Sequence, residues 1–203
     1  LPVLFDADAI NILGENKTWI PFVPKLSIFT PHPKEFERLA GHAADNFERN
    51  RMQREFSIKY TSYVVLKGAH TAVTCPDGSC YFNSTGNPGM ATGGSGDVLT
   101  GILLGLLASG YKPKEACLLG VYLHGLAADL AAESTGYEAL IAGDIIRNLP
   151  GAFKQISGTS EQIIFCQRIA TPDQSPKIRN RINNPLTYLL ISTALALTGT
   201  VAD

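Results

Sequence analysis

Apolar residues along this chain occur in two spacings, as short continuous runs and as longer stretches with a helical repeat. Short runs bounded by turn residues are typical of buried strands. They predict strands at Leu1–Phe5, Leu26–Phe29 and Tyr63–Leu66. Two further segments, Ala72–Thr74 and Cys80–Phe82, lie on either side of the turn Pro76-Asp77-Gly78, and this arrangement predicts a hairpin.

The longer stretches predict helices at Lys34–Ala40, Asp45–Lys59, Asp97–Ser109, Pro113–Glu133 and Ala142–Leu149. Glycines at 41 and 110 follow the first and third of these, as expected where a helix stops. In the second helix we expect Phe47, Met52 and Phe56 to contact the core. Strands that alternate with helices predict an α/β fold whose sheet is covered on both faces.

Polar residues follow each of the first three strands, in the segments Asp6–Asn11, Thr30–Pro33 and Lys67–Thr71. In α/β proteins the carboxyl ends of the strands are the usual position of a binding site. Two prolines stiffen the loop around His32. That histidine is either an exposed turn residue or a ligand contact, and Lys67 either binds a phosphate or lies on the surface.

The segment Gly86–Asp97 holds five glycines and one proline and runs directly into an apolar helix. The unpaired N–H groups and the dipole at a helix start attract anions, and glycines allow a phosphate to approach the backbone. Asp97 then stands where it could take a proton from a hydroxyl that attacks a phosphoryl group. The alternative is an ordinary glycine turn with Asp97 as a helix cap. The length of the run favours an anion-binding loop.

Composition narrows the classes of function. A chain of 203 residues with 45% hydrophobic and 17% charged residues fits one packed domain. The net charge of −1 gives no attraction to nucleic acid or to an anionic membrane. The histidines are widely separated, so a zinc site is not expected. Cys75 and Cys80 face each other across the predicted hairpin, where a disulfide is geometrically possible, but we expect reduced thiols.

The character of the sequence changes near residue 157. We expect a domain at 1–156 and a tail of unknown role at 157–203. Within this tail, Leu186–Ala202 is apolar and near the lower length limit for a membrane span. Its glycine and threonines favour a soluble segment, and we expect no membrane association.

Four motifs carry a resemblance to a known family. They are D-A-D-A-I-N at 6–11, T-P-H-P-K-E at 30–35, K-G-A-H-T at 67–71 and G-N-P-G-M-A-T-G-G-S-G-D-V-L at 86–99. In this order they resemble the ADP/ATP-dependent NAD(P)H-hydrate dehydratases, metabolite-repair enzymes of the ribokinase-like superfamily that are related to carbohydrate kinases. The resemblance covers Leu1 to Ile156. It implies a three-layer α/β/α fold with a mostly parallel sheet.

The resemblance also implies roles for individual residues. His32 would contact the hydrated NADH or NADPH, and Asp97 would contact its hydroxyl and act as the catalytic residue. The adenine nucleotide would be bound by Lys67, Gly68, Ala69, His70, Thr71, Gly94 and Gly96. A phosphoryl group would pass from ADP or ATP to the C6 hydroxyl, phosphate would leave, and the reduced nicotinamide would be restored. Mg²⁺ would bridge phosphate oxygens, with Asp6 and Asp8 either assisting through water or only capping strand ends.

Members of this family carry a further part before the strand at Leu1, and its absence implies an N-terminally incomplete domain and doubtful activity of this chain alone. Bacterial members often carry an epimerase domain upstream, so the resemblance also implies that the full protein is fused to one. A parallel sheet without its first units would expose an edge that invites pairing, so we expect a homo-oligomer. We expect a cytoplasmic protein. The alternatives are a small-molecule kinase of the same superfamily, acting on a hydroxymethylpyrimidine, a thiazole or a sugar, and a non-catalytic nucleotide-binding fragment. His124, in the middle of a predicted helix, is expected to be a core histidine.

Overall fold

The structure, a computed structural model, describes residues 2–158 of the chain. Nearly all of the predicted tail, including the apolar segment Leu186–Ala202, lies outside the described residues. The chain divides into two compact units, and the boundary falls between Asn83 and Ser84. The first unit holds the sheet, and the second holds the glycine-rich segment and the long apolar helices.

The first unit is built on a five-stranded sheet with the strand order β1-β2-β3-β4-β5. The strands are β1 (Leu4–Phe5), β2 (Ile28–Phe29), β3 (Tyr63–Leu66), β4 (Ala72–Thr74) and β5 (Cys80–Phe82). The first three pair in parallel, whereas β3 with β4 and β4 with β5 are antiparallel. The predicted hairpin is therefore confirmed. Because it adds two antiparallel pairs to the two parallel ones, the sheet is mixed, and the parallel arrangement expected for most of it is confined to β1–β3.

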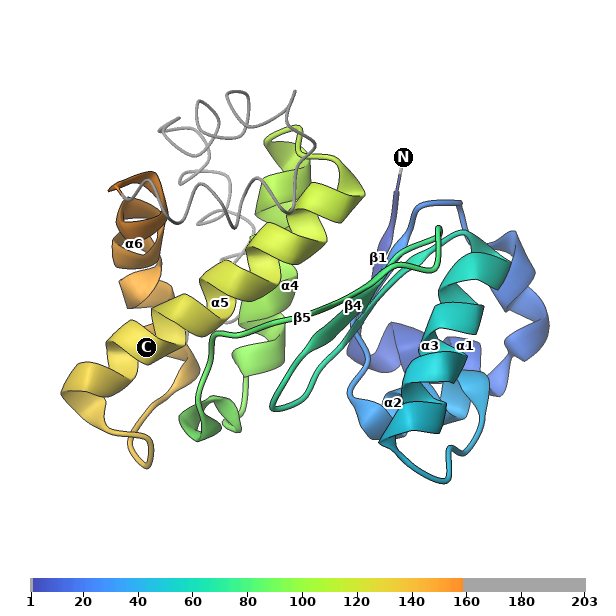
Figure 1. The fold of residues 1–203 in the computed structure, drawn as a ribbon, viewed down its shortest axis with the longest axis horizontal. Coiled ribbons are helices and arrows are strands. Elements are labelled where there is room, and N and C mark those ends of the chain that lie inside the picture. The colour runs from blue at the N-terminus through green and yellow to red at the C-terminus, as the bar shows by residue number, and fades with distance from the viewer. Residues whose placement is uncertain (1, 159–203) are drawn as a thin grey trace. The chain divides into compact units, whose positions relative to one another are not determined.

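Three α-helices and one 3-10 helix connect these strands: α1 (Ala7–Glu15), η1 (Lys17–Phe22), α2 (Pro33–Ala40) and α3 (Asn46–Tyr60). The α-helices lie on one side of the strands (Figure 1). Phe29 and Val64 occupy paired positions on β2 and β3 and are fully buried. They form one cluster with residues from all four helices, Ile10, Leu13, Ile20, Phe36, Leu39 and Phe56. This cluster fixes the helices against the strands whose ends carry the polar motifs.

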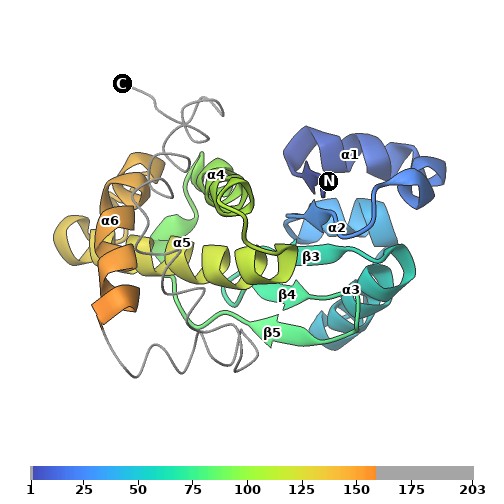
Figure 2. The same ribbon diagram turned by 90° about the horizontal axis from the view of Figure 1, so that it is seen from above.

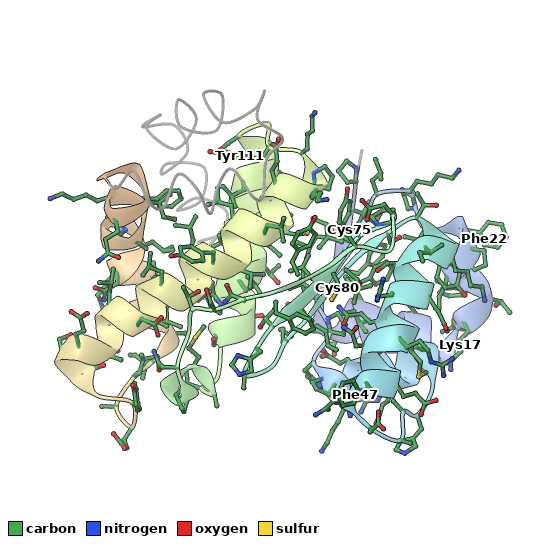
Figure 3. The ribbon with its side chains drawn as sticks, viewed as in Figure 1. Lys17, Phe22, Phe47, Cys75, Cys80 and Tyr111 are labelled. Atoms are coloured by element: carbon green, nitrogen blue, oxygen red, sulfur yellow. The ribbon has the colours of Figure 1, made fainter. Side chains whose placement is uncertain are left out.

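Two expectations for this unit are corrected. The first strand is shorter than predicted, and the polar residues that follow it belong to the start of a helix, because α1 begins at Ala7. Phe47 does not contact the core, since 88% of it is exposed on the first turn of α3 (Figure 3). Phe56, further along the same helix, is buried, and Met52 packs against the same cluster as expected.

In its described residues, the second unit contains the short 3-10 helix η2 (Pro88–Met90), followed by α4 (Ser95–Ala108), α5 (Pro113–Thr135) and α6 (Ala142–Gly158). Helix α5 packs against both α4 and α6 (Figure 2). A single cluster of buried side chains joins the three helices, among them Ile102, Leu123 and Phe153. Helix α5 is long and apolar enough to cross a membrane. However, 72% of its most apolar stretch is buried, as in the core helix of a folded domain.

The prediction for α6 was too short. The sequence placed its end at Leu149, yet the helix continues to Gly158 with Pro150 inside it. Beyond the proline, Ala152, Phe153 and Ile156 are all buried. Their burial compensates for the hydrogen bond that proline cannot donate.

The cysteine expectation is confirmed for the part of the chain that the structure describes. Cys75, Cys80 and Cys117 form no disulfide. Cys80 pairs with Thr74 in the hairpin register rather than with Cys75. Cys117 is fully buried in α5.

Candidate functional site

In the first unit, His32 forms the start of α2. Its Nδ1 accepts hydrogen bonds from the main-chain N–H groups of Lys34 and Glu35 at 3.1 and 3.2 Å. In return, Glu35 accepts the main-chain N–H of His32 at 2.7 Å, which completes a capping box. Pro33 occupies the first helical position, where a main-chain N–H group would have no partner within the helix and its absence costs nothing. The two prolines and the capping box therefore fix the orientation of the imidazole, which is 47% exposed.

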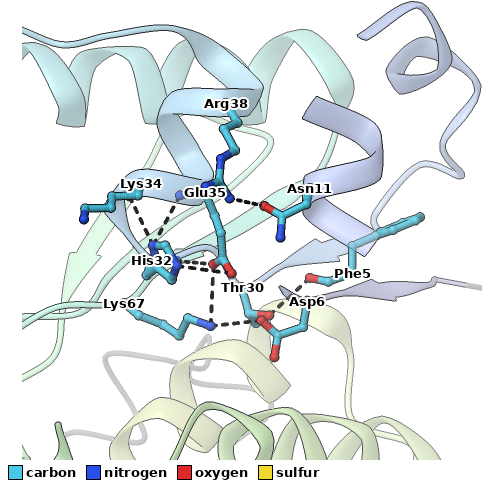
Figure 4. A network of polar contacts seen from close by, with 9 residues as sticks. All are labelled: Phe5, Asp6, Asn11, Thr30, His32, Lys34, Glu35, Arg38 and Lys67. Carbon is cyan, nitrogen blue, oxygen red and sulfur yellow. Dashed lines mark hydrogen bonds and ion pairs between the residues drawn. The ribbon is translucent and has the colours of Figure 1, made fainter. Parts of the chain in front are cut away.

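Lys67 lies at the end of β3 and joins the ends of the neighbouring strands. Its Nζ donates to the Asp6 carboxylate at 2.9 Å and lies 3.9 Å from the Glu35 carboxylate. Its main-chain N–H donates to the carbonyl of Pro31 at 2.8 Å. The structure thus gathers polar residues that follow β1, β2 and β3 into one network, as the sheet argument predicted (Figure 4).

The segment Lys67–Thr71 forms the connection between β3 and β4. Gly68, Ala69 and His70 are exposed, and Thr71 closes the turn by donating its hydroxyl to the Gly68 carbonyl at 3.2 Å. A side chain at position 68 would meet no described atom within 4 Å. The predicted nucleotide-binding residues of this unit therefore offer an open main-chain surface, while the ammonium of Lys67 faces two carboxylates.

The described residues contain no group of three or more His, Cys, Asp or Glu side chains arranged to hold a metal ion. Asp6 is paired with Lys67, and Asp8 is exposed on the first turn of α1. Mg²⁺ characteristically keeps several waters and binds through substrate phosphates with one or two carboxylates. The described residues therefore form no all-protein metal cage.

In the second unit, the glycine-rich segment Gly86–Asp97 divides into two halves. The first half is anchored to α5 by Asp129, whose carboxylate accepts the Gly86 main-chain N–H at 2.8 Å and the Asn87 side-chain amide at 3.0 Å. The Asn87 side chain caps η2 by accepting the N–H of Gly89 at 3.0 Å. A Cβ on Gly89 would lie 2.6 Å from the Tyr137 carbonyl oxygen, so only glycine fits this contact.

The second half is open. Gly93 is exposed, and a Cβ there would meet no described atom within 4 Å. Gly94 has a φ of 83°, a conformation that favours glycine, and it forms the N-cap of α4. The helix begins at Ser95, two residues before the predicted start, so Asp97 lies within its first turn and is exposed. The predicted anion-binding loop requires a helix start, with its unpaired N–H groups, and an exposed carboxylate in the same segment. The second half of the segment provides both.

His124 is buried in α5, as expected for a core histidine, with 7% of it exposed. Its Nε2 lies 3.4 Å from the hydroxyl of Ser95, which is the first residue of α4 and is also buried. This contact ties the start of α4 to α5.

Sequence reasoning missed two residues that position these groups. Glu35 was present in the T-P-H-P-x-E motif but was given no role, although its place three residues after the helix cap is a capping-box signal. Asp129 lies 42 residues after Asn87 and has no local signal. Its role follows only from the packing of α5.

Comparison with known proteins gives a consistent result. A family model described as NAD(P)H-hydrate dehydratase matches residues 1–151. A bifunctional NAD(P)H-hydrate repair enzyme from Moorella thermoacetica is 42% identical over 166 residues, which are 81% of this chain and 31% of that enzyme. The chain thus spans about a third of the length of this relative.

Two solved structures are also similar. The ADP/ATP-dependent NAD(P)H-hydrate dehydratase from Bacillus subtilis, co-crystallised with ATP and Mg²⁺, has a TM-score of 0.66 and 36% identity over 76% of this chain and 55% of that one. A ribokinase-like superfamily protein from Enterococcus faecalis has a TM-score of 0.62 and 32% identity, over 76% of this chain and 52% of that one. These likenesses confirm the α/β class and the ribokinase-like fold that the motifs predicted.

Proposed function

Because the chain belongs to the NAD(P)H-hydrate dehydratase family, we propose that the complete domain converts hydrated NADH or NADPH back to NADH or NADPH, using ADP or ATP. The relative from Bacillus subtilis is named for this activity and was crystallised with ATP and Mg²⁺. The proposal extends that activity to the domain of which this chain spans a part.

The chemistry explains why a nucleotide is needed for a dehydration. Hydroxide is a poor leaving group, whereas phosphate leaves readily. In the proposed reaction the C6 hydroxyl of the substrate attacks the terminal phosphoryl group and loses its proton, and the nucleotide leaves with one phosphate fewer. The C6–O bond then breaks and phosphate leaves with its electron pair. The adjacent carbon loses a proton, and the ring double bond is restored.

We assign the proton transfer to Asp97. Asp97 is exposed on the first turn of α4, directly after Gly94–Gly96 in the chain. The main-chain N–H groups of these residues and the helix dipole would stabilise charge on the transferred phosphoryl group. The observation that carries the proposal is the division of the glycine-rich segment, because an anchored half holds an open half in place for a ligand.

The remaining assignments follow the motifs. Lys67–Thr71, together with Gly94 and Gly96, would bind the nucleotide, and His32 would contact the hydrated dinucleotide. Mg²⁺, when bound, would neutralise phosphate charge and would be held mainly by phosphate oxygens and water. The exposed turn at Gly68–His70 supports a contact made by the main chain rather than by the Lys67 ammonium.

The test is an incubation of the protein with hydrated NADH, Mg²⁺ and either ADP or ATP. We expect the absorbance of reduced nicotinamide to return as inorganic phosphate is released, and only when nucleotide is present. Accumulation of a stable phosphorylated product without phosphate release would instead indicate a small-molecule kinase. Binding of nucleotide without turnover of any substrate would indicate a non-catalytic fragment.

Fusion to an epimerase domain, a homo-oligomeric state, a cytoplasmic location and a domain limit at residue 156 stay predictions. The bifunctional name of the relative from Moorella thermoacetica supports the first of them. Light scattering of the purified protein would measure the second.

A further inference from the structure

We propose that Glu35 is a positioning residue, which holds the His32 imidazole and the Lys67 ammonium in fixed orientations. This inference rests on the proposed function, because it concerns the residues assigned there to the dinucleotide and the nucleotide. It adds a role for a side chain that touches neither ligand.

Glu35 is 5% exposed and makes three contacts within the first unit. Its Oε2 accepts the main-chain N–H of His32 at 2.7 Å and lies 3.9 Å from the Lys67 Nζ. Its Oε1 lies 3.3 Å from the His32 Nε2 (Figure 4). A buried carboxylate needs such partners, because burying a charge without them is costly.

These contacts determine which tautomer of His32 is present. Nδ1 accepts two main-chain N–H groups, so in the neutral ring it carries no proton. In the neutral ring the proton is therefore on Nε2, which lies 3.3 Å from Glu35 Oε1 without the geometry of a hydrogen bond. A ligand at His32 thus meets an oriented ring whose Nε2–H lies beside the Glu35 carboxylate.

The same carboxylate acts on Lys67 together with Asp6. An ammonium between two carboxylates is held in place and is not available to a phosphate without breaking these pairs. Lys67 is the first residue of the segment Lys67–Thr71, which is assigned to the nucleotide. Glu35 thereby links the segment proposed for the dinucleotide to the segment proposed for the nucleotide.

The alternative is that Glu35 caps α2 without positioning other side chains, and the chain contains a second glutamate in a capping box. Helix α5 also begins with a proline, and Glu115 accepts the main-chain N–H of Lys112 at 3.0 Å. Glu115 is buried to a similar degree, at 7% exposed. Replacing each glutamate by glutamine keeps a carbonyl oxygen for the cap and removes the charge, so Glu115→Gln is the control for Glu35→Gln.

The experiment measures three quantities on the full chain and both variants: thermal stability, kinetics with hydrated NADH and ADP, and the ¹⁵N signals of the histidine rings. The His32→Gln variant identifies the His32 signals among those of the four histidines. We expect both glutamine variants to lower Tm by similar amounts. Only Glu35→Gln should raise the KM values of hydrate and nucleotide, by about tenfold, the size expected when a charged hydrogen bond becomes a neutral one. Only this variant should shift the His32 Nε2 signal.

If Glu35→Gln matches Glu115→Gln in KM and leaves the His32 signals unchanged, the positioning role is wrong and Glu35 is only a cap. If the unaltered chain shows no turnover but Glu35→Gln still shifts the His32 Nε2 signal, this chain is a non-catalytic fragment while the positioning role stands. Should Glu35→Gln not fold, the double variant Glu35→Gln, Lys67→Met removes both charges of the pair. The same His32 signal then decides the question.

Discussion

Asp129, in the middle of α5, accepts a hydrogen bond from the main-chain N–H of Gly86 at 2.8 Å. The two residues are 43 positions apart, and the contact fixes the first residue of the glycine-rich segment on a helix. Because the same carboxylate also accepts from the Asn87 side chain, it holds the turn that precedes the open half. The geometry of the proposed phosphate site therefore depends on a side chain outside it.

Replacing Asp129 by asparagine should weaken the segment without removing any group proposed to touch a ligand. An amide side chain can accept only one of the two hydrogen bonds, so we expect a loss of about 1 kcal/mol in unfolding free energy. We also expect weaker ADP binding by calorimetry. Glu133→Gln, one turn further along α5, is the control. Equal affinities in the two variants would show that the anchor does not matter for the nucleotide.

Gly125 provides a second test of the anchor. A Cβ there would lie 2.6 Å from the carbonyl carbon of Thr85, immediately before the segment. Gly125→Ala should therefore displace Thr85 and destabilise the protein by about 1–3 kcal/mol, the cost typical of overpacking. Gly143→Ala in α6 is the matched control, since its Cβ would approach only Arg147, at 3.7 Å. That variant should be stabilised by about 0.5–1 kcal/mol, and urea denaturation measures both.

The continuation of α6 past Pro150 makes a prediction about stability. Phe153 is 1% exposed and belongs to the cluster that joins the three helices of the second unit. Phe153→Ala should cost about 3–5 kcal/mol in unfolding free energy. Phe47→Ala, at a side chain that is 88% exposed, should change it by less than about 0.5 kcal/mol. A small effect at Phe153 would mean that the helix does not pack beyond the proline.

The sequence predicted local elements better than it predicted contacts. The limits of the β3, β4 and β5 strands agree with the structure to the residue, because apolar runs and the Pro-Asp-Gly turn signal them directly. Helix α1 was missed, since its first turn, Ala7-Asp8, reads as a polar strand end. The end of α6 was placed too early, at Leu149, because the local pattern does not reveal the burial of Phe153.

The positions of the site residues could be predicted only in part. Parallel strand order brings the residues after β1, β2 and β3 together, so the proximity of Asp6 and Lys67 follows from the pattern. Lys67 pairs with carboxylates rather than facing a ligand. This pairing depends on side-chain packing, which the spacing of residues in the sequence does not predict. The same holds for Asp129, whose partner is set by the packing of α5.

Asp97 provides the most direct test of the account, because its carboxylate is assigned the proton while the neighbouring main chain is assigned the phosphate. Asp97→Asn should be measured beside Asp144→Asn, which alters an acidic residue at the corresponding place in the first turn of α6. We predict that Asp97→Asn abolishes conversion of hydrated NADH while ADP binding by calorimetry stays near that of the unaltered protein, and that Asp144→Asn retains both. Near-normal turnover by Asp97→Asn would contradict the account.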